Sequence, residues 1–98
     1  MNPVNLIGDV YYRLAEARDV FPLMKLYQIG SIAGQKDSVF LNCSTLLEFI
    51  QSQNSVWIVA ERKGELLAVF SMLIDRENRL AKINRLYIDP GWDDWERL

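Results

Sequence analysis

The chain has 98 residues, half of them apolar, which is enough for the core of one small domain. Its formal net charge of −2 offers no basic surface of the kind that dominates nucleic-acid affinity, so we expect no nucleic-acid partner. The sequence contains no histidine and a single cysteine, Cys43, which excludes an internal disulfide and a Ser-His-Asp triad and leaves no expected metal site.

The first part of the sequence predicts a strand and then a helix. Val10–Leu14 is rich in β-branched and aromatic residues, which is typical of a short strand. Asp19 is a suitable N-cap for a helix that begins at Val20. From there, apolar residues recur at the i, i+3, i+4, i+7 spacing of a core-facing stripe, and Gly30 marks the end of the helix.

The second part predicts a short helix followed by three strands. The helix is expected over 45–52, because Thr45 and Glu48 have the spacing of a capping box. The turns that join the three strands are short, which demands antiparallel neighbours, so the strands form a meander. The expected strands are Val56–Glu61, Leu66–Ile74 and Leu80–Asp89. The fold class is therefore α+β, in the order strand, helix, helix and three-stranded antiparallel meander.

No segment has the pattern of a secretion signal or of a membrane span. No basic segment precedes an apolar stretch at the start of the chain, and the longest apolar run, 66–74, which Ser71 interrupts, is too short to cross a bilayer. We therefore expect a soluble, cytoplasmic chain with no membrane partner.

Two segments, VWIVAERKGELLAVFSMLI and AKINRLYIDP, together with this order of elements, resemble the first part of the GNAT family. Members of this family are acetyltransferases that move an acyl group from acyl-CoA to an amine. The resemblance runs from about Val10 to Pro90. It implies a partial acyl-CoA N-acyltransferase fold, and it implies that backbone groups at Leu86 and Ile88 contact acyl-CoA if the chain binds one.

The sequence departs from the family where the coenzyme's pyrophosphate binds. The family has a Gln/Arg-x-x-Gly-x-Gly/Ala signature there, at the start of a helix whose N–H groups face the pyrophosphate. The three signature positions correspond to Asp93, Glu96 and Leu98, and none of them matches. Together with Asp94, two of these residues place three carboxylates beside a polyanion, where each like-charge contact costs on the order of 1–3 kcal/mol. The same carboxylates suit the first turn of a helix that has no ligand.

The sequence also does not identify the general base that the family's reaction needs. Some members place a glutamate base on the last strand in an Ala-Glu-Ile context, whereas this chain has Ala-Lys-Ile with Lys82 in the middle. A lysine accepts a proton at neutral pH only when burial strongly depresses its pKa. Asp75, Glu77 or a water are alternative bases. Tyr87 is an acid in principle, but an aromatic at this position more often packs against the next helix.

The remaining candidate residues have structural interpretations. Cys43 lacks a histidine to activate its thiol, so a buried or half-buried structural role is expected. Trp92 and Trp95 are three residues apart and either anchor a partner or pack onto the sheet, the second being expected. Three arginines are expected to be solvated strand and turn residues: Arg76, Arg79 and Arg85.

These observations lead to three functional hypotheses. The first is a degenerate GNAT-like domain, residues 1–98, that acts as a regulatory, ligand-sensing or assembly module and needs no cofactor. The second is the N-terminal part of an acetyl-CoA-dependent N-acetyltransferase. The third is a small interaction protein of unrelated fold that dimerises through sheet edges. In the first two, the domain is incomplete, and we expect a second copy or a downstream domain to cover the exposed edge of the strand Leu80–Asp89.

Overall fold

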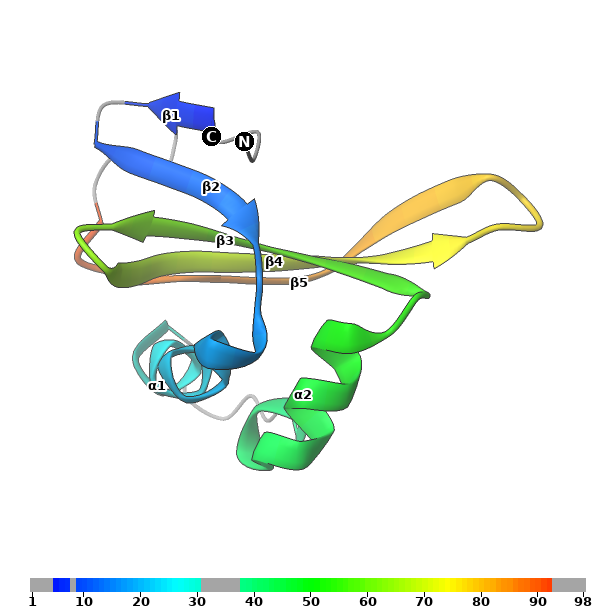
Figure 1. The fold of residues 1–98 in the computed structure, drawn as a ribbon, viewed down its shortest axis with the longest axis horizontal. Coiled ribbons are helices and arrows are strands. Elements are labelled where there is room, and N and C mark those ends of the chain that lie inside the picture. Colours follow the sequence, from blue (N-terminus) through cyan, green and yellow to red (C-terminus); the bar gives the residue numbers. More distant parts are fainter. Residues whose placement is uncertain (1–4, 8, 31–37, 93–98) are drawn as a thin grey trace.

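The structure is a computed structural model that describes residues 5–7, 9–30 and 38–92, and the structural statements below refer to these residues. They form one antiparallel sheet with the strand order β1-β2-β3-β4-β5, and both helices lie on the same face of it (Figure 1). The elements are β1 (Asn5–Ile7), β2 (Val10–Leu14), the 3-10 turn η1 (Ala17–Asp19), α1 (Val20–Gly30), the 3-10 turn η2 (Ser38–Leu41), α2 (Cys43–Gln51), β3 (Ser55–Arg62), β4 (Glu65–Asp75) and β5 (Leu80–Ile88).

The predicted strand β2 and helix α1 are confirmed, but Asp19 is not the N-cap of α1. The 3-10 turn η1 leads directly into the helix, and its N-cap is Glu16, whose backbone is extended. Asp19 is the last residue of the turn, and its carboxylate accepts the Glu16 N–H at 2.7 Å. The helical segment therefore begins three residues earlier than the sequence suggested, because the carboxylate reaches back along the chain.

Helix α2 also begins earlier than predicted. Asn42 caps it, and its side-chain oxygen accepts the N–H of Thr45 at 3.1 Å. The predicted capping box that starts at Thr45 is therefore wrong. Cys43 lies in the first turn and is exposed, so its predicted burial is wrong as well. Leu46 is the residue of this helix that is fully buried.

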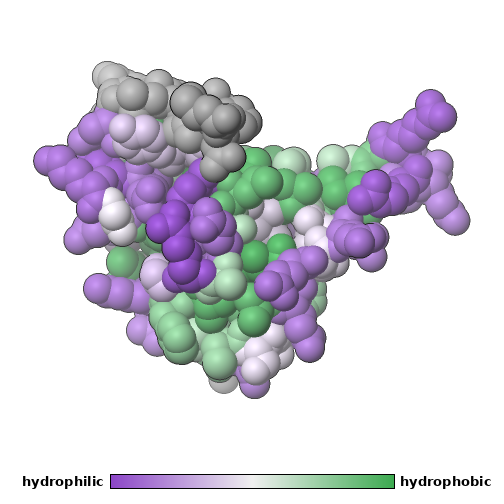
Figure 2. Space-filling model, viewed as in Figure 1, coloured by the Kyte–Doolittle hydropathy of each residue, from purple (hydrophilic) through white to green (hydrophobic). Residues whose placement is uncertain are grey.

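The meander β3-β4-β5 is confirmed, with β5 at one edge of the sheet. The turn between β3 and β4 has two residues with positive φ, Lys63 at 51° and Gly64 at 83°, which is the backbone of a type I′ hairpin. Beyond Ser55, where β3 begins, β4 and β5 continue as a hairpin that projects from the body (Figure 1). The tip of this distal hairpin, residues 76–79, is hydrophilic (Figure 2).

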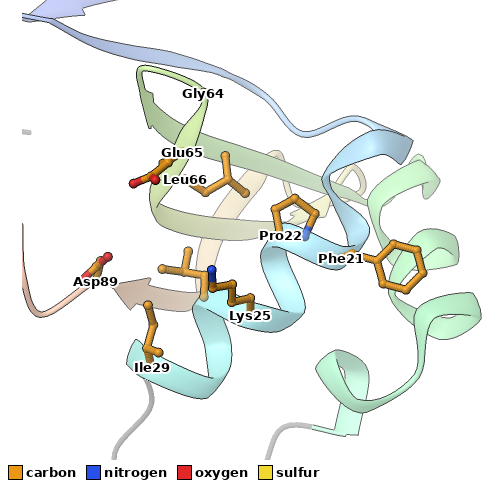
Figure 3. A pocket seen from close by; sticks show the side chains of 9 residues that line it. Phe21, Pro22, Lys25, Ile29, Gly64, Glu65, Leu66 and Asp89 are labelled. Atoms are coloured by element: carbon orange, nitrogen blue, oxygen red, sulfur yellow. The ribbon is translucent and has the colours of Figure 1, made fainter.

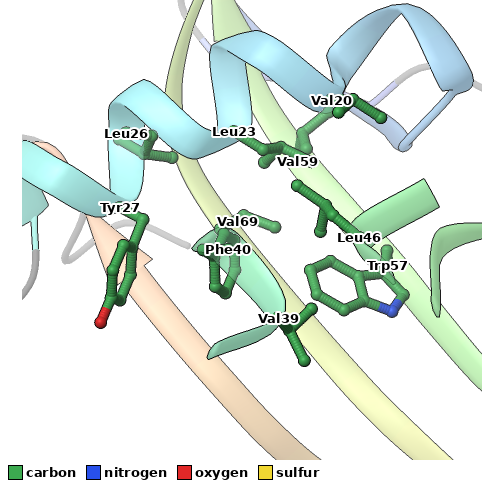
Figure 4. Close-up of a cluster of buried hydrophobic side chains, with 10 residues drawn as sticks. All are labelled: Val20, Leu23, Leu26, Tyr27, Val39, Phe40, Leu46, Trp57, Val59 and Val69. Carbon is green, nitrogen blue, oxygen red and sulfur yellow. The ribbon is translucent and has the colours of Figure 1, made fainter. Parts of the chain in front are cut away.

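The main core lies between the helices and the sheet. Its centre is aromatic: the rings of Tyr27 and Phe40 stack at 4.9 Å, and Phe40 also contacts Trp57. Figure 4 shows how these rings fit between α1 and the strands. The buried members are Val20, Leu23, Leu26, Tyr27, Val39, Phe40, Leu46, Trp57, Val59 and Val69.

A second, smaller core lies on the opposite face of the sheet. Trp92, which follows β5 by four residues, is 3% exposed and packs there with Val10, Ala60, Leu67 and Ala68. The expectation that Trp92 packs onto the sheet is therefore confirmed, whereas Trp95 lies outside the described residues. So do Asp93, the predicted helix start after Pro90 and the other signature positions.

In the described part of the chain, no helix is long and apolar enough to cross a membrane. Within the same residues, no group of three or more acidic or cysteine side chains is arranged to hold a metal ion.

Candidate functional site: the open edge of β5

The backbone of β5 presents alternate residues to solvent. The N–H of Asp89 donates to the carbonyl of Leu67 at 2.8 Å, which fixes which residues hydrogen-bond to β4. In an antiparallel ladder, every second residue exchanges hydrogen bonds with the neighbour and the residues between them face the other way. The backbone N–H groups of Tyr87 and Asp89 therefore point to β4. The N–H and C=O groups of Leu86 and Ile88 point to the open edge of the sheet.

A β-bulge divides β5 into two halves. Arg85 pairs with Ser71, but the next residue of β4, Met72, pairs with Ile83, so Asn84 is the extra residue. Bulges bend a strand and change the direction of its side chains and edge groups. The outward groups of Leu86 and Ile88 belong to the half that packs against the body, and residues 80–83 belong to the distal hairpin.

Tyr87 holds this half of β5 against the main core. Its ring meets Tyr27 of α1 and Phe40 of η2 edge-on, each at 5.2 Å between centroids. The packing role predicted for Tyr87 is confirmed, although its partners precede it in the chain and are not in a following helix. This packing fixes the strand segment on which Leu86 and Ile88 lie.

Arg85 is not the solvated residue that the sequence suggested. Its guanidinium lies 5.5 Å from the ring centroids of both Phe49 and Trp57, within cation–π range. Both aromatics are far from Arg85 in the sequence: the pairing of Trp57 with Ser71 and of Ser71 with Arg85 brings Trp57 near, and α2 contributes Phe49. Of the other two arginines, Arg76 donates to the carbonyl of Gln53 at 3.0 Å.

The side chain of Leu86 ends an apolar row on the face opposite the helices. The register aligns Leu14 with Ile58, Ile58 with Phe70 and Phe70 with Leu86 across four strands. Leu14 is 63% exposed and Leu86 is 50% exposed. Ile58 and Phe70, in the middle of the row, are half-buried, so its two ends are the accessible part.

The candidate bases lie in the distal hairpin and not beside Leu86 and Ile88. The Asp75 carboxylate accepts hydrogen bonds from the side chain and the backbone N–H of Asn78, at 2.8 and 3.2 Å, and these bonds lower the pKa of Asp75. A lowered pKa makes this carboxylate a weaker base. Lys82 is exposed, so it lacks the burial that its use as a base requires, and Glu77 is exposed in the turn. No catalytic residue is assigned.

The turn after β5 directs the chain across the sheet. One oxygen of the Asp89 carboxylate accepts the N–H of Gly91 at 2.8 Å, and the Asp89 carbonyl accepts the N–H of Trp92 at 3.0 Å. These two bonds close the Asp-Pro-Gly-Trp turn and place Trp92 on the face opposite α1.

No family model matches the sequence, and no curated protein matches it. Solved structures do match. The chain aligns with the PaiA N-acetyltransferase of Thermoplasma acidophilum, solved in complex with coenzyme A, at a TM-score of 0.73 and 19% identity, over 89% of this chain and 63% of that one. It aligns with the ribosomal-protein-S5-alanine acetyltransferase of Vibrio fischeri at 0.70 and 11%, over 94% and 58%.

A third similar structure is RimL, the ribosomal L7/L12 α-N-protein acetyltransferase, also in complex with coenzyme A. Its TM-score is 0.67 at 14% identity, and the match covers 97% of this chain and 60% of that one. The chain has a partial GNAT-like fold. It spans about three fifths of the length of these acetyltransferases. At such low identities, the likeness concerns the fold alone.

Proposed function

We propose that the chain is the N-terminal part of an acetyl-CoA-dependent N-acetyltransferase, and that the open edge at Leu86 and Ile88 receives the pantetheine arm of the coenzyme. The observation that supports this proposal is the outward direction of the N–H and C=O groups of these two residues. Pantetheine contains two amide groups, so it can pair with a free strand edge much as an added peptide strand does. Acetyl-CoA, when bound, supplies the acyl group that is transferred to an amine.

The contribution of this chain is to hold and orient the arm. Tyr87 and the bulge at Asn84 fix the outward groups on a rigid part of the sheet. A preorganised edge loses little conformational entropy when the ligand binds, which favours affinity.

An NMR titration of the 98-residue chain with acetyl-CoA tests this proposal. We expect saturable shifts of the backbone amide signals of Leu86 and Ile88, with smaller changes at Tyr87, whose N–H faces β4. Saturable binding that leaves the two outward amides unchanged would contradict the proposal, as would the absence of binding.

A second candidate function is a degenerate GNAT-like module with a regulatory, ligand-sensing or assembly role. The observation that favours it is the acidic run after Pro90, in which Asp93, Asp94 and Glu96 oppose a pyrophosphate. This reading predicts no use of acetyl-CoA as a cofactor.

Comparing pantetheine with coenzyme A separates the two candidates. In the transferase, the phosphates add affinity, so coenzyme A binds more tightly than pantetheine. In the degenerate module, the acidic run repels the phosphates, so pantetheine binds at least as tightly as coenzyme A. Replacing the three acidic residues by their amides then raises affinity for coenzyme A and leaves affinity for pantetheine unchanged.

We also propose that a second copy of the chain or a downstream domain covers the β5 edge, Leu80–Asp89 in the sequence, where the coenzyme does not occupy it. What supports this is the position of β5 at the edge of the sheet, where unpaired backbone groups attract another strand. The cytoplasmic location expected from the sequence stays a prediction.

A further inference from the structure

A cavity lies between α1 and the start of β4, separate from the outward groups of Leu86 and Ile88. Its volume is about 420 Å³, within the range of small-molecule sites. Figure 3 shows it bounded by α1 on one side and by the β3–β4 turn on the other, with Asp89 at one end. Leu26, which is buried, and Leu66, which is half-buried, contribute apolar surface to the lining. We refer to this cavity as the α1 trench.

Helix α1 presents a second stripe of side chains to the trench. Phe21, Lys25 and Ile29 follow one another at intervals of four residues, so they lie on one side of the helix. This side is distinct from the core face, and the main core leaves Phe21 73% exposed and Ile29 49% exposed. Both line the trench. The ring of Phe21 points away from Lys25 and the carboxylates (Figure 3), so the apolar wall beside these charges is formed by Leu26, Ile29 and Leu66.

Three charged side chains line the same cavity, and none of them has an ion-pair partner in the described part of the chain. They are Lys25, Glu65 and Asp89. One oxygen of Asp89 accepts the N–H of Gly91, which leaves the other oxygen for a ligand. The lining thus offers one cation and two carboxylates beside an apolar wall.

We propose that the α1 trench binds a free α-amino acid with an apolar side chain. Its ammonium group lies near Glu65 and Asp89, its carboxylate faces Lys25, and its side chain packs against Ile29 and Leu66. A zwitterion with an apolar body is the small-molecule class that complements both signs of charge and the apolar wall together. This site does not depend on the proposed binding of acetyl-CoA.

Titration of the full chain with L-phenylalanine as the probe tests the proposal. We expect saturable amide shifts at Lys25, Ile29, Gly64 and Glu65. Phenethylamine lacks the carboxylate and 3-phenylpropanoate lacks the ammonium group, so each should bind at least about tenfold more weakly, since a hydrogen bond to a charged group is lost. Absence of L-phenylalanine binding overturns the proposal. Equal affinity for phenethylamine also overturns it, in favour of a site for organic cations.

Matched variants test which charged side chain of the trench contacts which charged group of the ligand. Lys25→Gln should weaken L-phenylalanine binding about tenfold and leave phenethylamine binding unchanged, because only the amino acid has the carboxylate that Lys25 would bind. Glu65→Gln should weaken both. Lys82→Gln and Glu77→Gln remove the same charges from the exposed distal hairpin and should change neither affinity. Loss of binding in these two control variants, or an equal effect of Lys25→Gln on both probes, would contradict the assignment.

Discussion

Arg13 joins three parts of the molecule through its guanidinium group. It donates two hydrogen bonds to the Asp19 carboxylate, at 2.7 and 2.9 Å, and a third to Glu61 of β3 at 3.1 Å. Asp19 is only 3% exposed. Its burial alone would raise the pKa of the carboxyl, but the hydrogen bonds from Arg13 and from the Glu16 N–H outweigh burial and lower it. The hydrogen bond to Asp19 in turn raises the pKa of Arg13.

This lowered pKa predicts a loss of stability in acid. The stabilisation is fully present above the unfolded-state pKa of Asp, about 3.9, and is lost as the pH falls through the lower value in the folded chain. Urea unfolding between neutral pH and pH 2 should therefore show a falling free energy of unfolding below about pH 4.

The variant Asp19→Asn tests the source of that loss. It leaves Arg13 with a single carboxylate partner and should lower the free energy of unfolding at neutral pH by about 3 kcal/mol. It should also flatten the acid dependence. Asp9→Asn, at an exposed position, is the matched control. An acid dependence of Asp19→Asn as steep as that of the native chain would rule out this assignment.

Among the elements, β5 is the one whose backbone carries the proposed function. Leu86 has an outward N–H, so Leu86→Pro removes that donor without removing a bond to β4. We expect affinity for pantetheine to fall about fivefold, the equivalent of one hydrogen bond, while the circular dichroism spectrum is retained. Leu86→Val keeps the N–H and should bind as the native chain does. Unchanged affinity in the proline variant would exclude this donor from the site.

The β3–β4 turn gives a prediction about stability. Gly64 has φ of 83°, and a Cβ added there would meet nothing within 4 Å, so any cost of Gly64→Ala comes from the backbone alone. We expect the free energy of unfolding to fall by about 1 kcal/mol, the cost of a left-handed conformation for an L-residue. Chemical denaturation measures it, and an unchanged midpoint would show that the turn relaxes to another conformation.

The elements with strong local patterns could be predicted from the sequence, and those set by distant contacts could not. The meander, β2 and the core stripe of α1 follow from periodicity and composition. β1 has only three residues, too few for a pattern, and it is defined by its pairing with β2. The helix caps at Glu16 and Asn42 were missed because several polar residues near each helix start suit a cap, and the backbone geometry decides among them.

For the candidate sites, too, some residues could be predicted from the sequence and others depend on the tertiary fold. Leu86 and Ile88 were named from a resemblance to a family, and the structure supplies the reason why these two residues, and not Tyr87, face outward. The α1 trench was missed, although the spacing of Phe21, Lys25 and Ile29 was visible in the sequence as a second stripe. Its carboxylates come from other elements, which only the tertiary fold brings to α1.

At the scale of the whole molecule, the two faces of the sheet differ in how far other elements cover them. The helices bury one face, and the other carries an apolar row whose two ends, Leu14 and Leu86, are exposed, beside an edge that no described strand pairs with. The chain also spans about three fifths of the length of the acetyltransferases with this fold. An exposed apolar face beside an open edge favours association.

We therefore predict that the 98-residue chain associates with itself as its concentration rises. In sedimentation velocity, the native chain should shift to larger species, and Ile83→Lys should return it toward the monomer, because a charge on an edge strand opposes pairing. Ile83 is 64% exposed, so the thermal midpoint should not fall. Leu41→Lys, at a similarly exposed position on η2, is the control. A native chain that stays monomeric throughout, or equal effects of both variants, would contradict this prediction.

The bulge at Asn84 bears on how many molecules can bind to β5 at one time. Because the extra residue interrupts the ladder, the stretch on either side of it keeps its own orientation, and a molecule attached to one stretch need not displace a molecule attached to the other. Under the two proposals above, a coenzyme held at Leu86 and Ile88 and a second copy of the chain paired with residues 80–83 would therefore occupy opposite ends of β5 and would not compete for the same backbone groups.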